Sequence, residues 1–358
     1  MNRIEVTDPG KNDALISILT DADRVAIDTE FMREKTYYAQ LCLVQIATAT
    51  EIFCADPLTG TDLSRFWPAL NSCNWVLHSG RQDIEVFYQS NEQMPASVFD
   101  TQIAAGLLGY APQMGYATLV KELFGKELPK AHTRADWTRR PLSAEMLEYA
   151  AEDVEYLLDA ADQLSVRLSE LGRLDWANED SARLLEPGLY SECPANAIGR
   201  VKGAGKLAGR ARNAATALAA WREQRAVRRN RPRQWILRDA VLIELAVANP
   251  ENESALASIS GMPASTAQRS STELLEVLAG ATGGNESYVP PARPNEQQKL
   301  LLKTMQAEVA KTATDLGIAA ELIAPRKELS AVMLGERQSR VFSGWRLEAI
   351  GRRLLELL

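Results

Sequence analysis

The sequence predicts an α/β domain with a mixed sheet, followed by two all-α helical domains. Strand-like and helix-like stretches alternate over residues 1–190, whereas the pattern beyond residue 206 is helical almost throughout. Two stretches rich in proline, glycine and small residues separate these parts, at 186–205 and 280–294. We therefore expect domains at 1–190, 206–285 and 294–358, since 358 residues are too many for one core of ordinary size.

Strands of the first domain are expected where apolar and β-branched residues dominate short stretches. Three of them are spaced like a meander: RVAIDTEF at 24–31, QLCLVQIATAT at 40–50 and EIFCADPL at 51–58. WVLHSG at 75–80 is the fourth strand, and SVFD at 97–100 is a short strand that leads into a helix. Strands followed by helices predict a mixed sheet covered by helices.

Further helices of this domain are expected at 82–90 and at 116–124, the second of them ending at Gly125. One long helix is predicted over 143–171, with Ser143 as its N-cap. In the second domain a helix without a breaker runs from Asn213 to Arg229, and a later helix ends at Pro250.

Composition narrows the classes of function. Hydrophobic content of 46% and charged content of 24% are typical of a soluble globular protein. The sequence contains no apolar run of about 18 residues, so no membrane-spanning helix is expected. The segment MNRIEVTDPG lacks the apolar core of a secretory signal, so we expect a cytoplasmic protein whose four cysteines are reduced thiols. Two histidines nearly exclude a multi-histidine zinc site, so metal chemistry here would use carboxylates, which suit Mg²⁺ or Mn²⁺.

Charge is distributed unevenly along the chain. Residues 200–238 hold twelve lysines and arginines against the single acid Glu223, a local charge of +11 in a chain of net charge −7. The remainder therefore carries −18. This asymmetry predicts a separate basic module whose natural partners are polyanions.

Two carboxylates mark the end of the first predicted strand. Asp28 and Glu30 alternate around Thr29, so they share one face of the strand while Thr29 points away from it. Like charges side by side at the end of an apolar strand cost free energy unless a cation holds them. For this pair alone, two solvated surface charges are an equally good interpretation.

Two further acids have positions suited to chemistry. Asp83 follows the fourth strand, where a loop can aim it into a cleft, although an ordinary helix cap explains it as well. Asp153 lies four residues after Tyr149, so the phenol and the carboxylate share a helix face, although such a pair taken alone is more often an ordinary side-chain contact.

The motifs DTEF, HSGRQD and YAAED, in this order, resemble the three motifs of the DEDD 3′→5′ exonuclease superfamily. The tyrosine four residues before the last aspartate marks the DEDDy branch. The phrases LHSGRQDIEVF and TRADWTRRPLSAEMLEYAAEDVEYLL are similar to the ribonuclease D family, and the likeness covers essentially the whole chain. The resemblance implies a ribonuclease H-like exonuclease domain that hydrolyses phosphodiesters with two divalent metal ions, Mg²⁺ or Mn²⁺.

The resemblance also implies a role for each acid. Asp28 would bridge both metal ions, and Glu30 and Asp153 would hold the ion that activates the attacking water. Asp83 would anchor the second ion beside the leaving oxygen. Tyr149 would orient the water rather than act as a base, because an unperturbed phenol has a pKa of about 10.

Substrate contacts are expected from both ends of the chain. Phe31 could stack on the terminal base, and Arg134 and Arg139 could contact phosphates, although core packing or a solvated loop explains these residues equally well. The basic segment resembles the HRDC domain in Trp221-Arg222 and in Asn230 to Pro232, so Arg222 and Arg229 are expected to contact the RNA backbone. The phrase FSGWRLEAIG resembles the last helix of a second, diverged HRDC domain.

The function expected from these features is a metal-dependent 3′→5′ exoribonuclease that trims RNA with a free 3′ end, with tRNA precursors as substrate. The alternatives are a 3′→5′ DNA exonuclease of the same superfamily and a non-catalytic RNA-binding protein with an exonuclease fold. The complete set of acids argues against the second alternative. We expect a monomer without a membrane partner, although the sequence does not define the oligomeric state.

Overall fold

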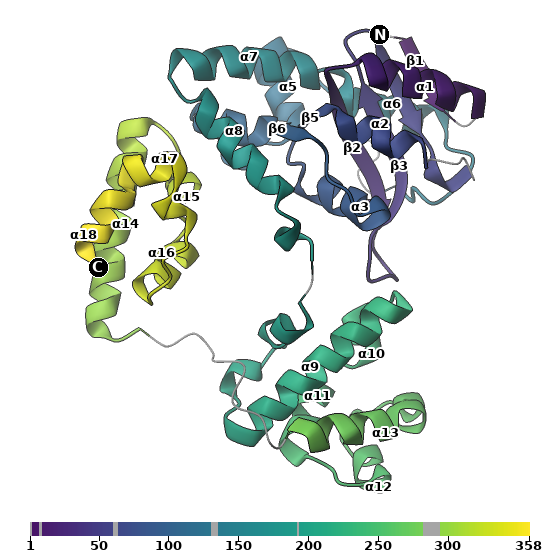
Figure 1. Cartoon of the computed structure of the whole chain (residues 1–358), viewed down its shortest axis with the longest axis vertical. Helices are drawn as coiled ribbons and strands as arrows, with labels where there is room; N and C mark the ends of the chain where they lie inside the picture. The colour runs from purple at the N-terminus through teal and green to yellow at the C-terminus, as the bar shows by residue number, and fades with distance from the viewer. Residues whose placement is uncertain (1, 7–8, 60–63, 130–134, 192, 282–293) are drawn as a thin grey trace. The chain divides into compact units, whose positions relative to one another are not determined.

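The computed structural model describes residues 2–6, 9–59, 64–129, 135–191, 193–281 and 294–358 (Figure 1). Its contacts divide the chain into two compact units. Unit 1 comprises Met1–Met32, Leu41–Leu189 and Arg293–Leu358, and unit 2 comprises Arg33–Gln40 and Tyr190–Ala292. The segment that was expected as a third domain is thus grouped with the α/β part of the chain.

Unit 1 is built on a six-stranded mixed sheet in the order β1-β4-β3-β2-β5-β6. Strand β4 pairs parallel with β1 and antiparallel with β3, whereas β5 pairs parallel with both β2 and β6. The strands are β1 (Asn2–Val6), β2 (Arg24–Met32), β3 (Gln40–Ala47), β4 (Glu51–Ala55), β5 (Asn74–Leu77) and β6 (Ser97–Asp100). The predicted mixed sheet is confirmed. Strand β1 was missed, because the stretch NRIEV holds only two apolar residues, and so short an alternation does not by itself predict a strand.

The helices of the α/β part are α1 (Pro9–Asp21), α2 (Phe66–Ser72), α3 (Arg81–Asn91), α4 (Thr101–Leu107), α5 (Tyr116–Phe124), α6 (Ala144–Glu155), α7 (Leu157–Glu170) and α8 (Leu174–Ala182). Two of the expected helix ends are confirmed. Ser143 caps α6, its hydroxyl accepting a hydrogen bond from the backbone N–H of Met146 at 3.3 Å. Gly125 ends α5 in the left-handed conformation, with φ of 67°.

The single helix predicted over 143–171 is wrong at one residue, Tyr156. There the backbone leaves the helical region, with φ of −107° and ψ of 1°, and separates α6 from α7. The N–H of Tyr156 donates instead to the hydroxyl of Tyr116, at 3.1 Å. No local pattern around Tyr156 predicts this break, because the interrupting partner lies forty residues earlier on α5.

The last segment of the chain completes the core of unit 1. Met305 and Ile323 are buried in one cluster with Ala104 of α4 and Leu164 of α7. The helices of this segment are α14 (Glu296–Leu316), α15 (Ala320–Ile323), α16 (Arg326–Met333), α17 (Gly344–Arg346) and α18 (Arg352–Leu357).

A buried ion pair joins the last segment to α8. The guanidinium of Arg346, 1% exposed, binds both carboxylate oxygens of Asp180 at 2.5 and 2.8 Å. Beside it, the ring of Trp345 stacks on Trp176 with a centroid distance of 4.5 Å. Because the ion pair and Trp345 are buried and Trp176 is half-buried, this contact fixes the last segment against the α/β part.

Unit 2 is a small helical unit. Its helices are α9 (Gly209–Arg229), α10 (Arg233–Ile236), α11 (Asp239–Ala248), α12 (Glu253–Ala257) and α13 (Ala264–Gly280). Leu218, Leu242 and Leu274 lie in its core, and Tyr37 from the loop Arg33–Gln40 packs against the same core. Among the described residues of the chain, no helix is long and apolar enough to cross a membrane.

Candidate active site

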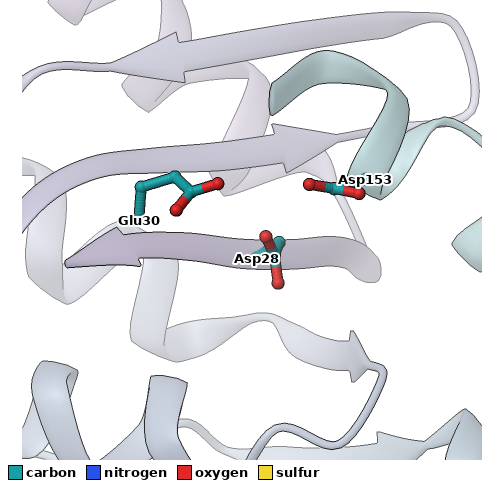
Figure 2. Close-up of side chains that lie close together, drawn as sticks. All are labelled: Asp28, Glu30 and Asp153. Carbon is teal, nitrogen blue, oxygen red and sulfur yellow. The ribbon is translucent and has the colours of Figure 1, made fainter. Parts of the chain in front are cut away.

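Three predicted metal ligands meet at the end of β2. Asp28 and Glu30 lie on one face of this strand, and Asp153 reaches toward them from α6, which packs against β2 (Figure 2). One carboxylate oxygen from each residue lies within 4.8 Å of the others. The strand period of two and the capped start of α6 therefore bring together acids that are far apart in the sequence.

The electrostatics of this cluster favour a cation. Burial, and then the charges of Asp83, Asp153 and Glu30, raise the pKa of Asp28 well above its ordinary value. Burial first, and then the charges of Asp153 and Asp83, raise the pKa of Glu30 to about 8. Burial also raises the pKa of Asp153 to about 7, although the hydrogen bond from Tyr149 lowers it. A divalent ion among these oxygens would offset the cost of burying the carboxylates and the repulsion between them. The three carboxylates supply the oxygen ligands that suit Mg²⁺ or Mn²⁺. The residues present thus fit a hard metal ion.

Asp83 lies beside this group rather than within it. It is in the first turn of α3 and is 7% exposed, and its Oδ1 accepts a hydrogen bond from the hydroxyl of Thr29 at 2.5 Å. Burial raises its pKa to about 6. Its charge in turn raises the pKa values of Asp28 and Glu30, so it belongs to the same electrostatic site. Sequence reasoning missed the role of Thr29, which points away from the two strand acids but fixes the third.

Tyr149 lies one helical turn before Asp153, and its hydroxyl donates a hydrogen bond to that carboxylate. Burial, and then the charges of Asp153, Glu30 and Asp28, raise the pKa of Tyr149 above its ordinary value. The phenol is therefore protonated at neutral pH and can orient a neighbouring oxygen but cannot serve as a base. Its ring is tilted against Trp137, with centroids 6.2 Å apart.

Asp100 is a positioning residue that sequence reasoning did not single out. Its buried carboxylate accepts hydrogen bonds from the backbone N–H groups of Ser79 and Gly80, at 3.1 and 2.9 Å, and caps α4 through Gln102 at 2.8 Å. It thus holds the turn that leads from β5 into α3 and to Asp83. An aspartate directly before the helix TQIAAGL was the available signal, because it is typical of an N-cap.

The residues of unit 1 that were predicted to contact the substrate differ in their exposure to solvent. Phe31 is half-buried at the end of β2. The side chain of Arg139 is 83% exposed, with its Nε 3.2 Å from Asp136. Arg134 lies outside the described residues.

The two residues of unit 2 that were predicted to contact RNA differ in exposure. Arg229 is exposed near the end of α9. Arg222 is 2% exposed, and its guanidinium donates to Asp239 at 2.6 Å and to the carbonyl of Leu237 at 3.0 Å. The expectation that Arg222 contacts RNA is therefore wrong, because the buried side chain links α9 to the start of α11 through these hydrogen bonds. The basic segment includes arginines that hold the fold together.

Comparisons with known proteins agree with this geometry. Residues 4–169 match the family model for a 3′–5′ exonuclease, and residues 211–278 match that for an HRDC domain. The chain is similar to the ribonuclease D of Acidiphilium cryptum, at 38% identity over 96% of this chain and 90% of that protein. It is also similar to the ribonuclease D of Pseudomonas paraeruginosa, at 36% identity over 93% and 92%. The crystal structure of Escherichia coli RNase D, described as an exoribonuclease involved in structured RNA processing, has a TM-score of 0.89 at 29% identity and covers 100% of this chain and 99% of that one.

Proposed function

Because the chain belongs to the ribonuclease D family of 3′→5′ exoribonucleases, we propose that its carboxylate cluster holds two divalent metal ions for hydrolysis of RNA from the 3′ end. The observation that carries this proposal is the convergence of Asp28, Glu30 and Asp153 within 4.8 Å. Mg²⁺ and Mn²⁺ are the ions that an all-oxygen ligand set favours.

We assign a role in this hydrolysis to each acid of the cluster and to Tyr149, based on the contacts of each side chain. Bound divalent ions supply the charge that activates a water and stabilises the leaving 3′ oxygen. Asp28 would be a ligand common to both ions, because its carboxylate interacts with those of Asp83, Asp153 and Glu30. Glu30 and Asp153 would help to hold one ion, and Asp83, held by Thr29, would serve the other. Tyr149, whose hydroxyl donates a hydrogen bond to Asp153, would orient the attacking water by accepting a hydrogen bond from it.

The substrate is RNA with a free 3′ end, and tRNA precursors are the class we propose. The similarity to an Escherichia coli enzyme that processes structured RNA supports this substrate. The HRDC domain at 211–278 supplies exposed arginines for a phosphate backbone, and Phe31 and Arg139 are the candidate contacts near the metal cluster.

Two finer assignments belong to the same proposal. We assign 294–358 to a second, diverged HRDC-type domain, supported by its helical content and the SGWR phrase. We also place the protein in a reducing cytoplasm, supported by four free cysteines, three of them buried, and we propose that it is a monomer.

The test is hydrolysis of matched 3′-labelled RNA and DNA oligonucleotides with Mg²⁺ or Mn²⁺. We expect release of mononucleotides from RNA by the wild type and no release by Asp28→Asn, which removes the bridging charge but keeps the side-chain volume. Asp159→Asn on α7 makes the same charge change at an exposed position and should retain full activity.

Equal rates for the wild type and Asp28→Asn would show that the cluster is not the catalytic site. Preferential degradation of DNA would contradict the assigned substrate class.

A further inference from the structure

One surface of unit 2 combines exposed arginines with an exposed tryptophan. Trp235, on the short helix α10, is 58% exposed, although tryptophan is usually largely buried. The guanidinium of Arg231 lies over its ring, with Cζ 5.9 Å from the centroid. Arg228 and Arg229 are exposed at the end of α9, directly before this pair. Four basic or aromatic side chains therefore reach solvent within eight consecutive positions.

The loop Arg33–Gln40 is anchored at the same place. Asn230 ends α9 in the left-handed conformation, with φ of 45°, and its Oδ1 accepts hydrogen bonds from the backbone N–H groups of Tyr37 and Tyr38, both at 3.0 Å. Arg231 donates to the carbonyl oxygen of Lys35 at 3.4 Å. The exposed Lys35 is thus held next to the exposed arginines of α9.

A buried polar cluster fixes this anchor. The hydroxyl of Tyr37 donates to Glu223, which is 1% exposed. Arg233 donates to both oxygens of Glu223, at 2.6 and 2.7 Å, and its guanidinium lies 4.7 Å from the centroid of the Tyr37 ring. Because these contacts take up Glu223, the only acid between residues 200 and 238, the exposed part of the segment is purely basic.

This combination suits single-stranded nucleic acid better than a folded partner. Arginines attract the phosphate backbone, and an exposed ring offers a face on which any base can stack. A cation–π contact, like that of Arg231 on Trp235, orients the ring while leaving its other face to solvent. An acidic protein would need the charges but not the ring.

We propose that Lys35, Arg228, Arg229, Arg231 and Trp235 form a capture surface for single-stranded RNA, with one base stacked on Trp235 and phosphates on the basic residues. The inference rests on the proposed exoribonuclease function and adds a binding site outside the metal cluster. Arg33 follows directly on β2, the strand of Asp28 and Glu30, so the captured RNA contacts a loop that is covalently continuous with the catalytic strand.

The main test measures affinity, so that it does not depend on hydrolysis. A 3′-labelled single-stranded RNA is titrated with the full chain carrying Asp28→Asn, and binding is followed by fluorescence anisotropy. Adding Trp235→Ala should weaken binding about 5- to 100-fold, whereas Trp235→Phe, which keeps a ring, should retain most of it. Arg231→Ala should also weaken binding and reduce the slope of log affinity against log salt by about 0.7.

Two controls separate this surface from other effects. Arg269→Ala removes the same charge from an exposed position on α13 and should leave affinity unchanged. Asn230→Gly keeps the left-handed conformation but removes the acceptor that anchors the loop, so it should weaken binding without changing the ring. Unfolding temperatures of all variants establish that they are folded.

Activity assays distinguish failure of this inference from failure of the proposed function. With Asp28 restored, Trp235→Ala should raise KM for a long single-stranded RNA and leave kcat unchanged. If Trp235→Ala and Arg231→Ala bind RNA as tightly as their parent, the capture surface is wrong even though hydrolysis persists. Equal affinities of the Ala and Phe variants at Trp235 would overturn the stacking contact.

Discussion

Thr29 shows how one buried hydroxyl serves a site that it does not face. It lies between Asp28 and Glu30 on β2 but donates to Asp83, which is thereby held beside the cluster. A hydrogen bond to a charged group contributes about 1.5–3 kcal/mol, so its loss would release the Asp83 carboxylate. The residue is a positioning group for a proposed metal ligand.

Thr29→Val should therefore raise the Mg²⁺ concentration needed for half-maximal RNA hydrolysis several-fold, because the shape is kept while the donor to Asp83 is lost. Thr29→Ser keeps the hydroxyl and should restore the wild-type value. The measurement is the hydrolysis rate as a function of Mg²⁺ concentration. An unchanged metal dependence for the valine variant would show that Asp83 does not serve the metal site.

The raised pKa values of the cluster predict how metal-free stability depends on pH. Folded Glu30 has a pKa of about 8, against about 4.3 for an unperturbed glutamate, so between these values the folded state holds a proton that the unfolded state has lost. The contribution of Glu30 to the free energy of unfolding is therefore fully present at low pH. It is lost as pH rises toward 8, because folding then requires binding a proton.

In EDTA, Glu30→Gln should unfold at a higher temperature than the wild type at pH 8, and this difference should shrink toward pH 5. Thermal unfolding at several pH values is the measurement, with Asp159→Asn as the control that lies outside the cluster. A difference that is independent of pH would contradict the raised pKa.

At the residue scale, sequence reasoning succeeded where local rules applied. The strand period placed Asp28 beside Glu30, and the helix period placed Tyr149 beside Asp153. It failed for Arg222, whose partner Asp239 begins a different helix. Burial depends on contacts between elements, and a pattern of charges does not reveal them.

At the element scale, the long, strongly periodic helices and the capped helix starts were predicted well. The helix that ends at Arg229 and the caps at Ser143 and Gly125 follow from local propensity and capping chemistry. The break at Tyr156 was missed because it depends on a tertiary hydrogen bond to Tyr116. The contacts of loop 33–40 were likewise not predicted, because its partners lie about two hundred positions away in the sequence.

Whole-molecule organisation was the hardest feature to predict. The linker composition at 280–294 indicated a separate last domain, yet α14 to α18 share a core with α4 and α7. The matching apolar faces belong to amphipathic helices of both parts, and amphipathicity does not specify which surface a helix will cover.

A chain that ends at residue 292 should consequently be unstable. It would expose the apolar faces of α4 and α7 and leave Asp180 buried without Arg346, and loss of one partner of a buried pair costs about 3–5 kcal/mol. We expect a lower unfolding temperature and aggregation, measured by thermal unfolding and light scattering. Arg346→Met in the full chain isolates the ion pair, and full stability of both proteins would contradict the shared core.

The pair of Asp180 and Arg346 also means that unit 1 cannot complete its folding until nearly the whole chain has been translated. The two residues are 166 positions apart, and the larger part of unit 2, Tyr190–Ala292, is synthesised between them. At about 5–20 residues per second, Asp180 waits roughly 8–30 s for its partner. During this interval the nascent nuclease presents an uncovered apolar surface that chaperones can bind, and a ribosome that stalls in unit 2 releases a product suited to proteolysis.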